Sequence, residues 1–235
     1  MRVAIMQPYF LPYIGYFQLM AAVDAFVVYD NIKFTKSGWI NRNRLLLDGR
    51  DTLFSLPIQK ASDALDVVDR SIAEDFELLK VRAKFATAYA KSPGFVPGMQ
   101  LVDEVLAGSR ANLFEFLHAG LRRVRDHLGI TAPIIVSSTV PIDHGLKGQR
   151  KVLALCEALG ASTYLNAIGG LDLYGATDFA SRGIALQFLK PRLTPYPQAC
   201  PAFVPALSII DVLMHVPMPA ARAQLDDFDL IEAAA

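Results

Sequence analysis

The chain has 235 residues, of which 53% are hydrophobic and 20% are charged, and this supports one globular domain with a sizeable core. Its 23 basic and 23 acidic residues cancel, so a nucleic-acid partner has no global electrostatic support. Mean hydropathy is high, at +0.31, yet no uninterrupted apolar run approaches the roughly 20 residues of a membrane span.

The first elements predict a parallel β-α-β unit. Residues 3–6 form a short apolar run, residues 15–22 carry apolar side chains at helical spacing, and residues 25–29 form a second apolar run. Two parallel strands send their following loops to the same edge of the sheet. Open α/β folds bind their ligands at that edge, so we expect the site there.

The middle of the chain has a different pattern. Residues 52–58 are a strand candidate entered through the Asp48-Gly49 turn. From Ile72 onward, apolar residues recur at helical period, and two further helices are expected over residues 99–107 and 111–128. We therefore predict a helical subdomain at about residues 72–130.

The α/β alternation then resumes. Strands are expected at residues 134–137, 162–165 and 184–189, and helices at 149–159 and 178–182. Gly160 stands where a helix-ending glycine belongs, and Ser208 and Asp211 form a capping-box pair that opens a last helix. The sequence thus predicts one three-layer α/β domain over residues 1–216, with a mostly parallel sheet and a helical insertion. Residues 217–235 are expected to form a loosely held tail.

The loop after the first strand is the first candidate site. Two prolines make it rigid, and Gly15 lets a ligand approach the start of a helix, where free amides favour anions. Gln7, Tyr9, Tyr13 and Tyr16 are expected to contact a sugar or a base. The alternative is that these tyrosines and prolines only pack a rigid turn.

Residues 13–16 (Tyr-Ile-Gly-Tyr) resemble the His-x-Gly-His motif that nucleotidyltransferases and class I aminoacyl-tRNA synthetases place after their first strand. Both histidines are absent here. Tyrosine is neutral at pH 7 and supplies no positive charge to a phosphate. The resemblance therefore favours a HUP-like, nucleotidyltransferase-like fold more than it favours adenylyl transfer.

The polar segment after the second strand is the second candidate site. Its four cations suit a phosphorylated ligand, Trp39 is placed to stack on a base, and Asp30 is a candidate catalytic base. The alternative is a solvated basic loop. The candidate binding residues are Lys33, Lys36, Trp39, Asn41, Arg42, Asn43 and Arg44.

A third candidate lies at residues 143–151, before a helix. Glycines flank Lys147, which is a plausible second phosphate contact, although the segment fits no Walker pattern. His144 is a candidate acid or base, but a lone loop histidine is more often exposed and without a role.

Compartment and metal content follow from what the sequence lacks. The N-terminus has no long apolar stretch of the signal-peptide kind, and no metal-ligand spacing is present. Cys156 and Cys200 fit no disulfide framework. We expect a cytoplasmic protein with reduced thiols, no metal site and no nucleic-acid partner.

The chain resembles the WbqC-like protein family over nearly its whole length to about residue 215. The opening motif at residues 6–17 (Met-Gln-Pro-Tyr-Phe-Leu-Pro-Tyr-Ile-Gly-Tyr-Phe) carries the resemblance, and residues 39–44 (Trp-Ile-Asn-Arg-Asn-Arg) match the family's Asn-Arg-Asn signature. Later segments support it, at residues 159–165, 196–198 and 207–211. The resemblance implies a role in bacterial surface-polysaccharide (O-antigen, lipopolysaccharide) biosynthesis, in which an amino-acid or acyl group is added to an amino sugar.

We therefore expect an acyl- or aminoacyltransferase that forms an amide on a nucleotide-linked amino sugar. The donor is left open between a thioester on an acyl carrier protein and an ATP-derived acyl group. In this hypothesis Asp30 or His144 takes the proton of the amine. The alternatives are an ATP-dependent ligase that makes an acyl-adenylate and a non-catalytic binding protein of a polysaccharide assembly complex.

Overall fold

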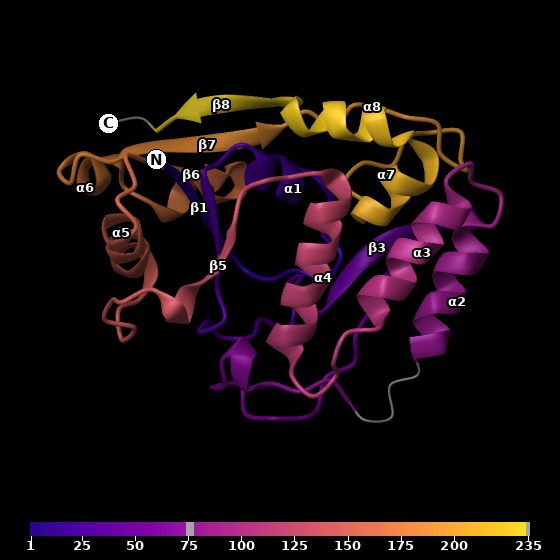
Figure 1. The fold of residues 1–235 in the computed structure, drawn as a ribbon, viewed down its shortest axis with the longest axis horizontal. Helices are drawn as coiled ribbons and strands as arrows, with labels where there is room; N and C mark the ends of the chain where they lie inside the picture. The colour runs from indigo at the N-terminus through magenta and orange to yellow at the C-terminus, as the bar shows by residue number, and fades with distance from the viewer. Residues whose placement is uncertain (74–77, 234–235) are drawn as a thin grey trace.

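The computed structural model describes residues 1–73 and 78–233 (Figure 1). Its centre is a six-stranded sheet in the order β5-β2-β1-β6-β7-β8, with every neighbouring pair parallel except β7 and β8. The protein is thus an α/β protein with a mostly parallel sheet, as predicted. The strands are β1 (Arg2–Met6), β2 (Ala25–Val28), β5 (Ile134–Val136), β6 (Thr163–Ala167), β7 (Ala185–Pro191) and β8 (Phe228–Glu232).

Strand β2 is apolar throughout, and β1 is apolar from Val3 to Met6, because both faces of the sheet are covered. On β1, Val3 and Ile5 pack with one hydrophobic cluster while Ala4 packs with another. Helices α5 (Gly148–Ala158) and α6 (Ala176–Ala180) cover the Val3 side. Helices α1 (Ile14–Ala21) and α7 (Ile209–His215) belong to the other side, which makes three layers.

The chain changes direction across the sheet at β1. It runs from β1 to β2 and β5 on one side, then returns to β6 and β7 on the other side. The loops after β1 and β6 therefore diverge, and a crevice forms between the carboxyl ends of neighbouring strands. This is the position at which the sequence predicts a ligand.

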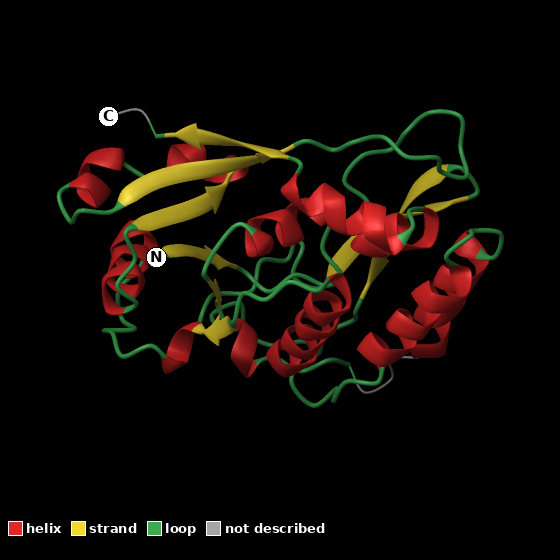
Figure 2. Cartoon of the chain, turned by 45° about the horizontal axis from the view of Figure 1, so that its top comes forward, coloured by secondary structure: helices red, strands yellow, loops and turns green. Residues whose placement is uncertain are grey.

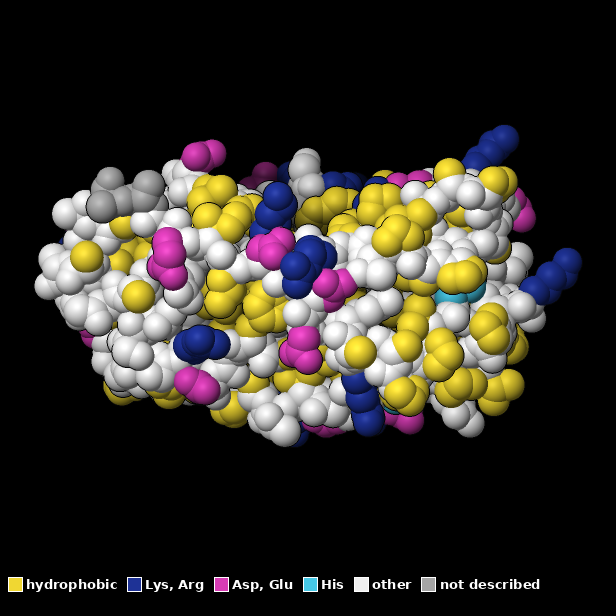
Figure 3. All heavy atoms as spheres, turned by 90° about the horizontal axis from the view of Figure 1, so that it is seen from above, with side chains coloured by type: hydrophobic (Ala, Val, Ile, Leu, Met, Phe, Trp, Pro, Cys, Tyr) yellow, Lys and Arg dark blue, Asp and Glu magenta, His cyan; other side chains and the backbone are white. Residues whose placement is uncertain are grey.

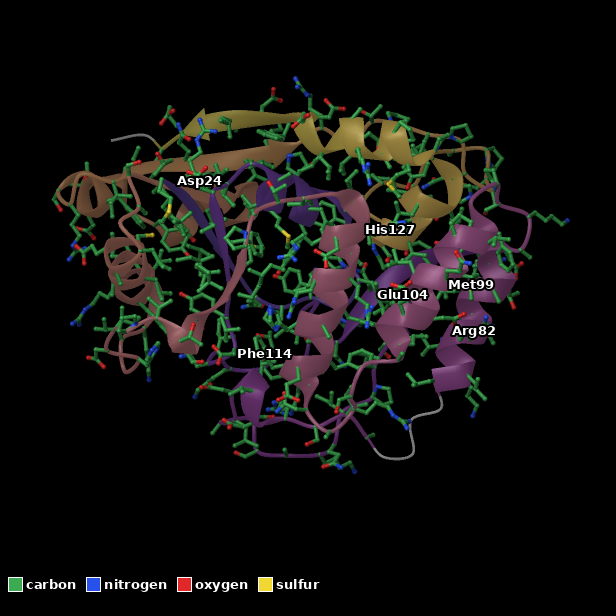
Figure 4. All side chains as sticks on the ribbon, viewed as in Figure 1. Asp24, Arg82, Met99, Glu104, Phe114 and His127 are labelled. Atoms are coloured by element: carbon green, nitrogen blue, oxygen red, sulfur yellow. The ribbon has the colours of Figure 1, made fainter. Side chains whose placement is uncertain are left out.

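Helices α2 (Leu78–Tyr89), α3 (Phe95–Leu106) and α4 (Leu113–Leu128) lie side by side within the region where the sequence predicts helices (Figures 1 and 4). Asn112 caps α4 by accepting from the Glu115 amide, and Gly129 ends it in the left-handed conformation. Arg82 on α2 makes a bidentate ion pair with Asp103 on α3. The predicted helical repeat also includes residues 74–77, which lie outside the described residues.

The segment after β2 differs from the expected loop. Residues 42–47 form strand β3 (Arg42–Leu47), which pairs with β4 (Arg50–Ser55) in a hairpin apart from the main sheet (Figure 2). Asp48 and Gly49 form the turn, both with positive φ. The first half of β3 is polar at every position, because Arg42 and Arg44 flank the buried Asn43, so the sequence indicated a polar loop.

The C-terminal segment also differs from the expected loose tail. It forms helix α8 (Met218–Ala223) and strand β8, which pairs with β7 and closes one edge of the sheet. The Gln18 amide on α1 donates to the carbonyl oxygens of Gln224 and Asp227 and so anchors the segment to the core.

The face of the molecule that is seen from above carries acidic and basic side chains close together (Figure 3). None of the helices in the described ranges has the length and apolar character that crossing a bilayer requires.

Candidate functional site

A cavity of about 810 Å³ opens at the carboxyl ends of β1, β2 and β6. Its size falls within the roughly 300–1,000 Å³ that small-molecule sites occupy. The wall residues come from the ends of these strands, from the start of α5 and from the loop around η3 (Ile168–Leu173). The side chains used below are Gln7, Tyr9, Tyr29, Asn31, Lys33, Asp66, His144, Lys147, Lys151, Asn166, Leu173 and Tyr174.

Three lysine side chains border this cavity. Lys33 follows β2, and Lys147 and Lys151 stand four residues apart at the start of α5. Lys147 is the N-cap residue of α5, and its side chain makes no capping hydrogen bond to the first turn of the helix. A helix N-terminus with nearby ammonium groups favours an anionic ligand.

Asp66 is the only carboxylate among the described residues that line the cavity. It faces Lys33 in an antiparallel bridge, and the structure places no ion pair between the two side chains within the described ranges. The cavity therefore offers both positive groups and one negative group, which suits a ligand that carries a phosphate and an amine.

Lys151 is held at the cavity wall by Asn31. Its ammonium donates to the Asn31 carbonyl oxygen at 3.0 Å and to Asn31 Oδ1 at 2.8 Å, and it lies 5.3 Å from the Tyr29 ring centroid. Burial lowers the pKa of Lys151, and the charges of Asp66 and Asp30 oppose that shift. An ammonium has three donors, so two bonds to Asn31 leave one for a ligand.

His144 is fixed by the same asparagine. Because Asn31 Oδ1 accepts from Lys151, the amide group of Asn31 that faces His144 Nδ1 at 2.9 Å is the donor. His144 Nε2 lies 3.0 Å from the Val140 carbonyl oxygen, which only accepts. These partners assign a neutral ring with its proton on Nε2, and both ring nitrogens are engaged.

Asp30 does not line the cavity and is only 4% exposed. Its carboxylate accepts from Ser137 Oγ at 2.7 Å and from the Ser138 amide at 3.0 Å. Burial raises the pKa of Asp30, but the hydrogen bonds from Ser138 and Ser137 outweigh it, so the pKa is lowered. These contacts join the end of β2 to the turn after β5.

Of the residues that the sequence predicts for the site, the structure brings five to the cavity: Gln7, Tyr9, Lys33, His144 and Lys147. The others lie away from its walls: Tyr13, Tyr16, Asp30, Lys36, Trp39, Asn41, Arg42, Asn43 and Arg44. Tyr16 is buried, and its hydroxyl donates to the Gln7 carbonyl oxygen. Lys36 is exposed and pairs with Asp63.

The loop after β1 and the segment after β2 do meet, but the contact is a structural one, between the Asn43 side chain and backbone carbonyl oxygens. Asn43 is buried and donates to the carbonyl oxygens of Phe10 and Leu11. Leu11 has a positive φ of 45°, which is uncommon for a side chain of this kind, and Ser208 Oγ also donates to its carbonyl oxygen. Asn43 therefore holds a strained turn in place.

The cationic residues of the hairpin have partners of their own. The Arg42 guanidinium donates to the carbonyl oxygens of Gly38 and Ser37 and lies 5.7 Å from the Trp39 ring centroid. Arg44 pairs with Asp51 and lies 5.8 Å from the same ring. Asn41 donates to the Leu56 carbonyl oxygen.

Sequence reasoning did not name several residues of the cavity as site residues, among them Asn31, Asp66, Lys151 and Asn166. Asn31 and Asn166 carried a readable signal, because each is polar and stands at the carboxyl end of a buried strand. Lys151 stands one helical turn beyond Lys147 and so shares its face. Asp66 lies in an irregular segment and gave no comparable signal.

The fold defines an α/β protein with a cavity at the switch point of its sheet. The family model of the WbqC-like protein family matches residues 7–223, and the chain belongs to that family. It is similar to the Uncharacterized protein Rv1507c of Mycobacterium tuberculosis, with 26% identity over 92% of this chain and 94% of that protein. No solved structure matches the chain.

Proposed function

We propose that this protein transfers an acyl or aminoacyl group to the amine of a nucleotide-linked amino sugar, as a step in making a bacterial surface polysaccharide. The observation that carries the proposal is the mixed charge of the cavity, in which Lys33, Lys147 and Lys151 face the same space as Asp66. A nucleotide-linked amino sugar presents a diphosphate to the lysines and an amine to the carboxylate.

A HUP-like fold is part of the proposal. The five parallel strands follow the order third, second, first, fourth, fifth when they are numbered along the chain, which is the doubly wound order of nucleotide-binding sheets. Tyr9 and Tyr29 border the cavity and offer ring faces to the sugar or base.

The chemistry needs an amine with a free electron pair. Its nitrogen attacks the carbonyl carbon of a thioester donor, a C–N bond forms, and the C–S bond breaks. Asp66 takes the proton that the amine loses and passes it to the departing thiolate. Asp66 is better placed for this role than the predicted bases, since Asp30 lies outside the cavity and both nitrogens of His144 are engaged.

A mass-spectrometric screen tests the activity. Nucleotide amino sugars are incubated with the protein and either an acyl thioester or ATP with an amino acid. A new amide from the thioester supports the proposal, whereas product that forms only with ATP and releases pyrophosphate supports the ligase alternative.

Calorimetric titration with UDP-glucosamine tests the site without requiring turnover. K147Q is expected to weaken binding about tenfold, the effect of losing about 1.4 kcal/mol from a charge-assisted hydrogen bond. K60Q, which removes an exposed lysine away from the cavity, serves as the matched control. Equal affinities of K147Q and the unmodified protein would remove Lys147 from the site.

Asp30 and His144, the two predicted bases, are already hydrogen-bonded within the protein. This observation favours a second candidate function, that of a binding protein without catalysis. This binding-protein hypothesis predicts that UDP-glucosamine binds but that no donor yields an amide. It also predicts that D66N leaves the role of the protein in a polysaccharide assembly complex intact.

A further inference from the structure

Asn166 holds an unused hydrogen-bond donor at the cavity wall. The residue lies near the end of β6 and is only 5% exposed. Its Oδ1 accepts from the Ala167 amide at 2.9 Å, which fixes the orientation of the side-chain amide. In the part of the chain that the structure describes, Nδ2 has no acceptor, and it is not among the fully buried polar atoms, so this donor is open to the cavity that Asn166 lines.

Gly170 makes room for this amide. A Cβ added at residue 170 would overlap Asn166 Nδ2 and would come within 3.1 Å of its Cγ. Any larger residue at 170 would therefore displace the donor from its position. The absence of a side chain at residue 170 thus keeps a fixed, unpaired donor at the cavity wall, where a ligand can accept from it.

The cavity wall around Asn166 carries no charge. The charged side chains come from the loop after β2, from the segment containing Asp66 and from the start of α5. The wall on the β1 and β6 side is instead formed by Ile5, Met6, Ala167, Gly170, Leu173 and Tyr174. A neutral, mainly apolar wall with one fixed donor suits an acyl group, whose carbonyl oxygen accepts a single hydrogen bond.

We propose that Asn166 Nδ2 donates to the carbonyl oxygen of the acyl group and stabilises the negative charge that this oxygen gains as the amine attacks. This inference rests on the proposed function. As the C–N bond forms, the carbonyl electron pair moves to the oxygen, and it returns when the bond to the leaving group breaks. A donor fixed before the reaction stabilises that oxyanion without having to reorient.

The kinetic test compares N166A and N166D with the unmodified protein. N166D keeps the Oδ1 acceptor for Ala167 but replaces the donor. Both variants are expected to lower kcat for amide formation by about 10²–10³-fold, the effect of losing one oxyanion donor, with the KM for the nucleotide sugar nearly unchanged. A raised KM with unchanged kcat would instead show that Asn166 binds a phosphate, and would overturn the proposal.

A binding test needs no turnover. UDP-glucosamine and UDP-N-acetylglucosamine differ only in the acetyl group, and their affinities are measured by calorimetry for each variant. N166A is expected to weaken binding of the acetylated sugar about tenfold and to leave UDP-glucosamine unaffected. Equal losses for both sugars would overturn the assignment of Asn166 to the acyl group while leaving the phosphate site intact. If the unmodified protein binds neither sugar, both the proposed function and this inference fail.

The glycines provide matched variants within one turn. G170A is expected to reproduce the selective loss of N166A because its Cβ displaces the amide. G169A places a Cβ that meets no atom within 4 Å and is expected to keep the discrimination between the two sugars. If G169A and G170A lose it equally, the turn and not the amide controls the site.

Discussion

At the scale of single residues, the polar side chains that follow the strands divide into those that hold the protein together and those that face the cavity. Asp30 and Asn31 are adjacent, yet Asp30 turns to Ser137 while Asn31 holds Lys151. Both contacts use charge-assisted hydrogen bonds, which are stronger than neutral ones. Position after a strand therefore places a residue near the site without deciding what it does.

The lowered pKa of Asp30 predicts how stability depends on pH. Its carboxylate form is favoured in the native state, so its contribution is complete above its ordinary pKa of 3.8 and is lost as pH falls through the lower native pKa. D30N is expected to reduce the free energy of unfolding at pH 7 by about 1–3 kcal/mol and to flatten its decline in acid.

Urea unfolding between pH 2.5 and pH 7 measures this effect. D172N, which changes an exposed carboxyl, is the control and is expected to follow the unmodified protein. An unchanged pH profile for D30N would show that the Ser137 and Ser138 contacts do not stabilise the charged form.

At the scale of elements, the segment from α8 to β8 gives the sheet one of its edges. Removing it would leave β7 with unpaired backbone groups, and an open edge strand promotes association between chains. It would also remove Ala221 and Leu225 from the core and leave the Gln18 amide without its two acceptors.

A chain that ends at residue 216 is therefore expected to aggregate or to unfold at a much lower temperature than the full chain. Thermal unfolding and size-exclusion chromatography measure this. The control is D229A in the full chain, which removes only a surface ion pair with Arg192 and should change stability by less than about 1 kcal/mol. A stable, monomeric truncated chain would contradict the structural role of this segment.

The elements that the sequence predicts well are those with a strong apolar period. The parallel strands and the helices α3, α4 and α5 were found within a few residues, because burial on one or both faces leaves a clear pattern. Strand β3 was missed because its outward residues are arginines, and β8 because its half-exposed edge position allows polar residues.

Asp211 shows that a residue in a recognised motif can have a different role in the structure. Ser208 caps α7 as predicted, but Asp211 instead accepts hydrogen bonds from Tyr89, Tyr196 and Gln198.

At the scale of the whole molecule, the sequence located the edge of the sheet that carries the cavity but not all of its walls. The loop after β1 and the start of α5 were both expected near a ligand, and the cavity includes parts of each. The hairpin was assigned to the same site because its cations resemble a phosphate-binding loop. Only the three-dimensional pairing of Arg44 with Asp51, and of Arg42 with backbone oxygens, shows that these charges are already engaged.

Hydrogen exchange tests the extent of the site across the molecule. Saturating UDP-glucosamine is expected to slow amide exchange at residues 144–151 and 166–174, by up to about 100-fold where exchange requires the ligand to leave. The hairpin at residues 42–55 should keep its exchange rates, since it does not line the cavity. Protection of the hairpin instead would move the binding site to the cluster around Trp39.

Because β1 has β2 on one side and β6 on the other, the cavity is lined by residues 5–33 and Asp66 from the first part of the chain and by residues 144–174 from a much later part. During synthesis on the ribosome, a nascent chain holds only half of the binding surface until more than a hundred further residues have emerged. The ligand therefore cannot guide the earliest folding steps. Ligand binding requires that both halves of the sheet have already assembled.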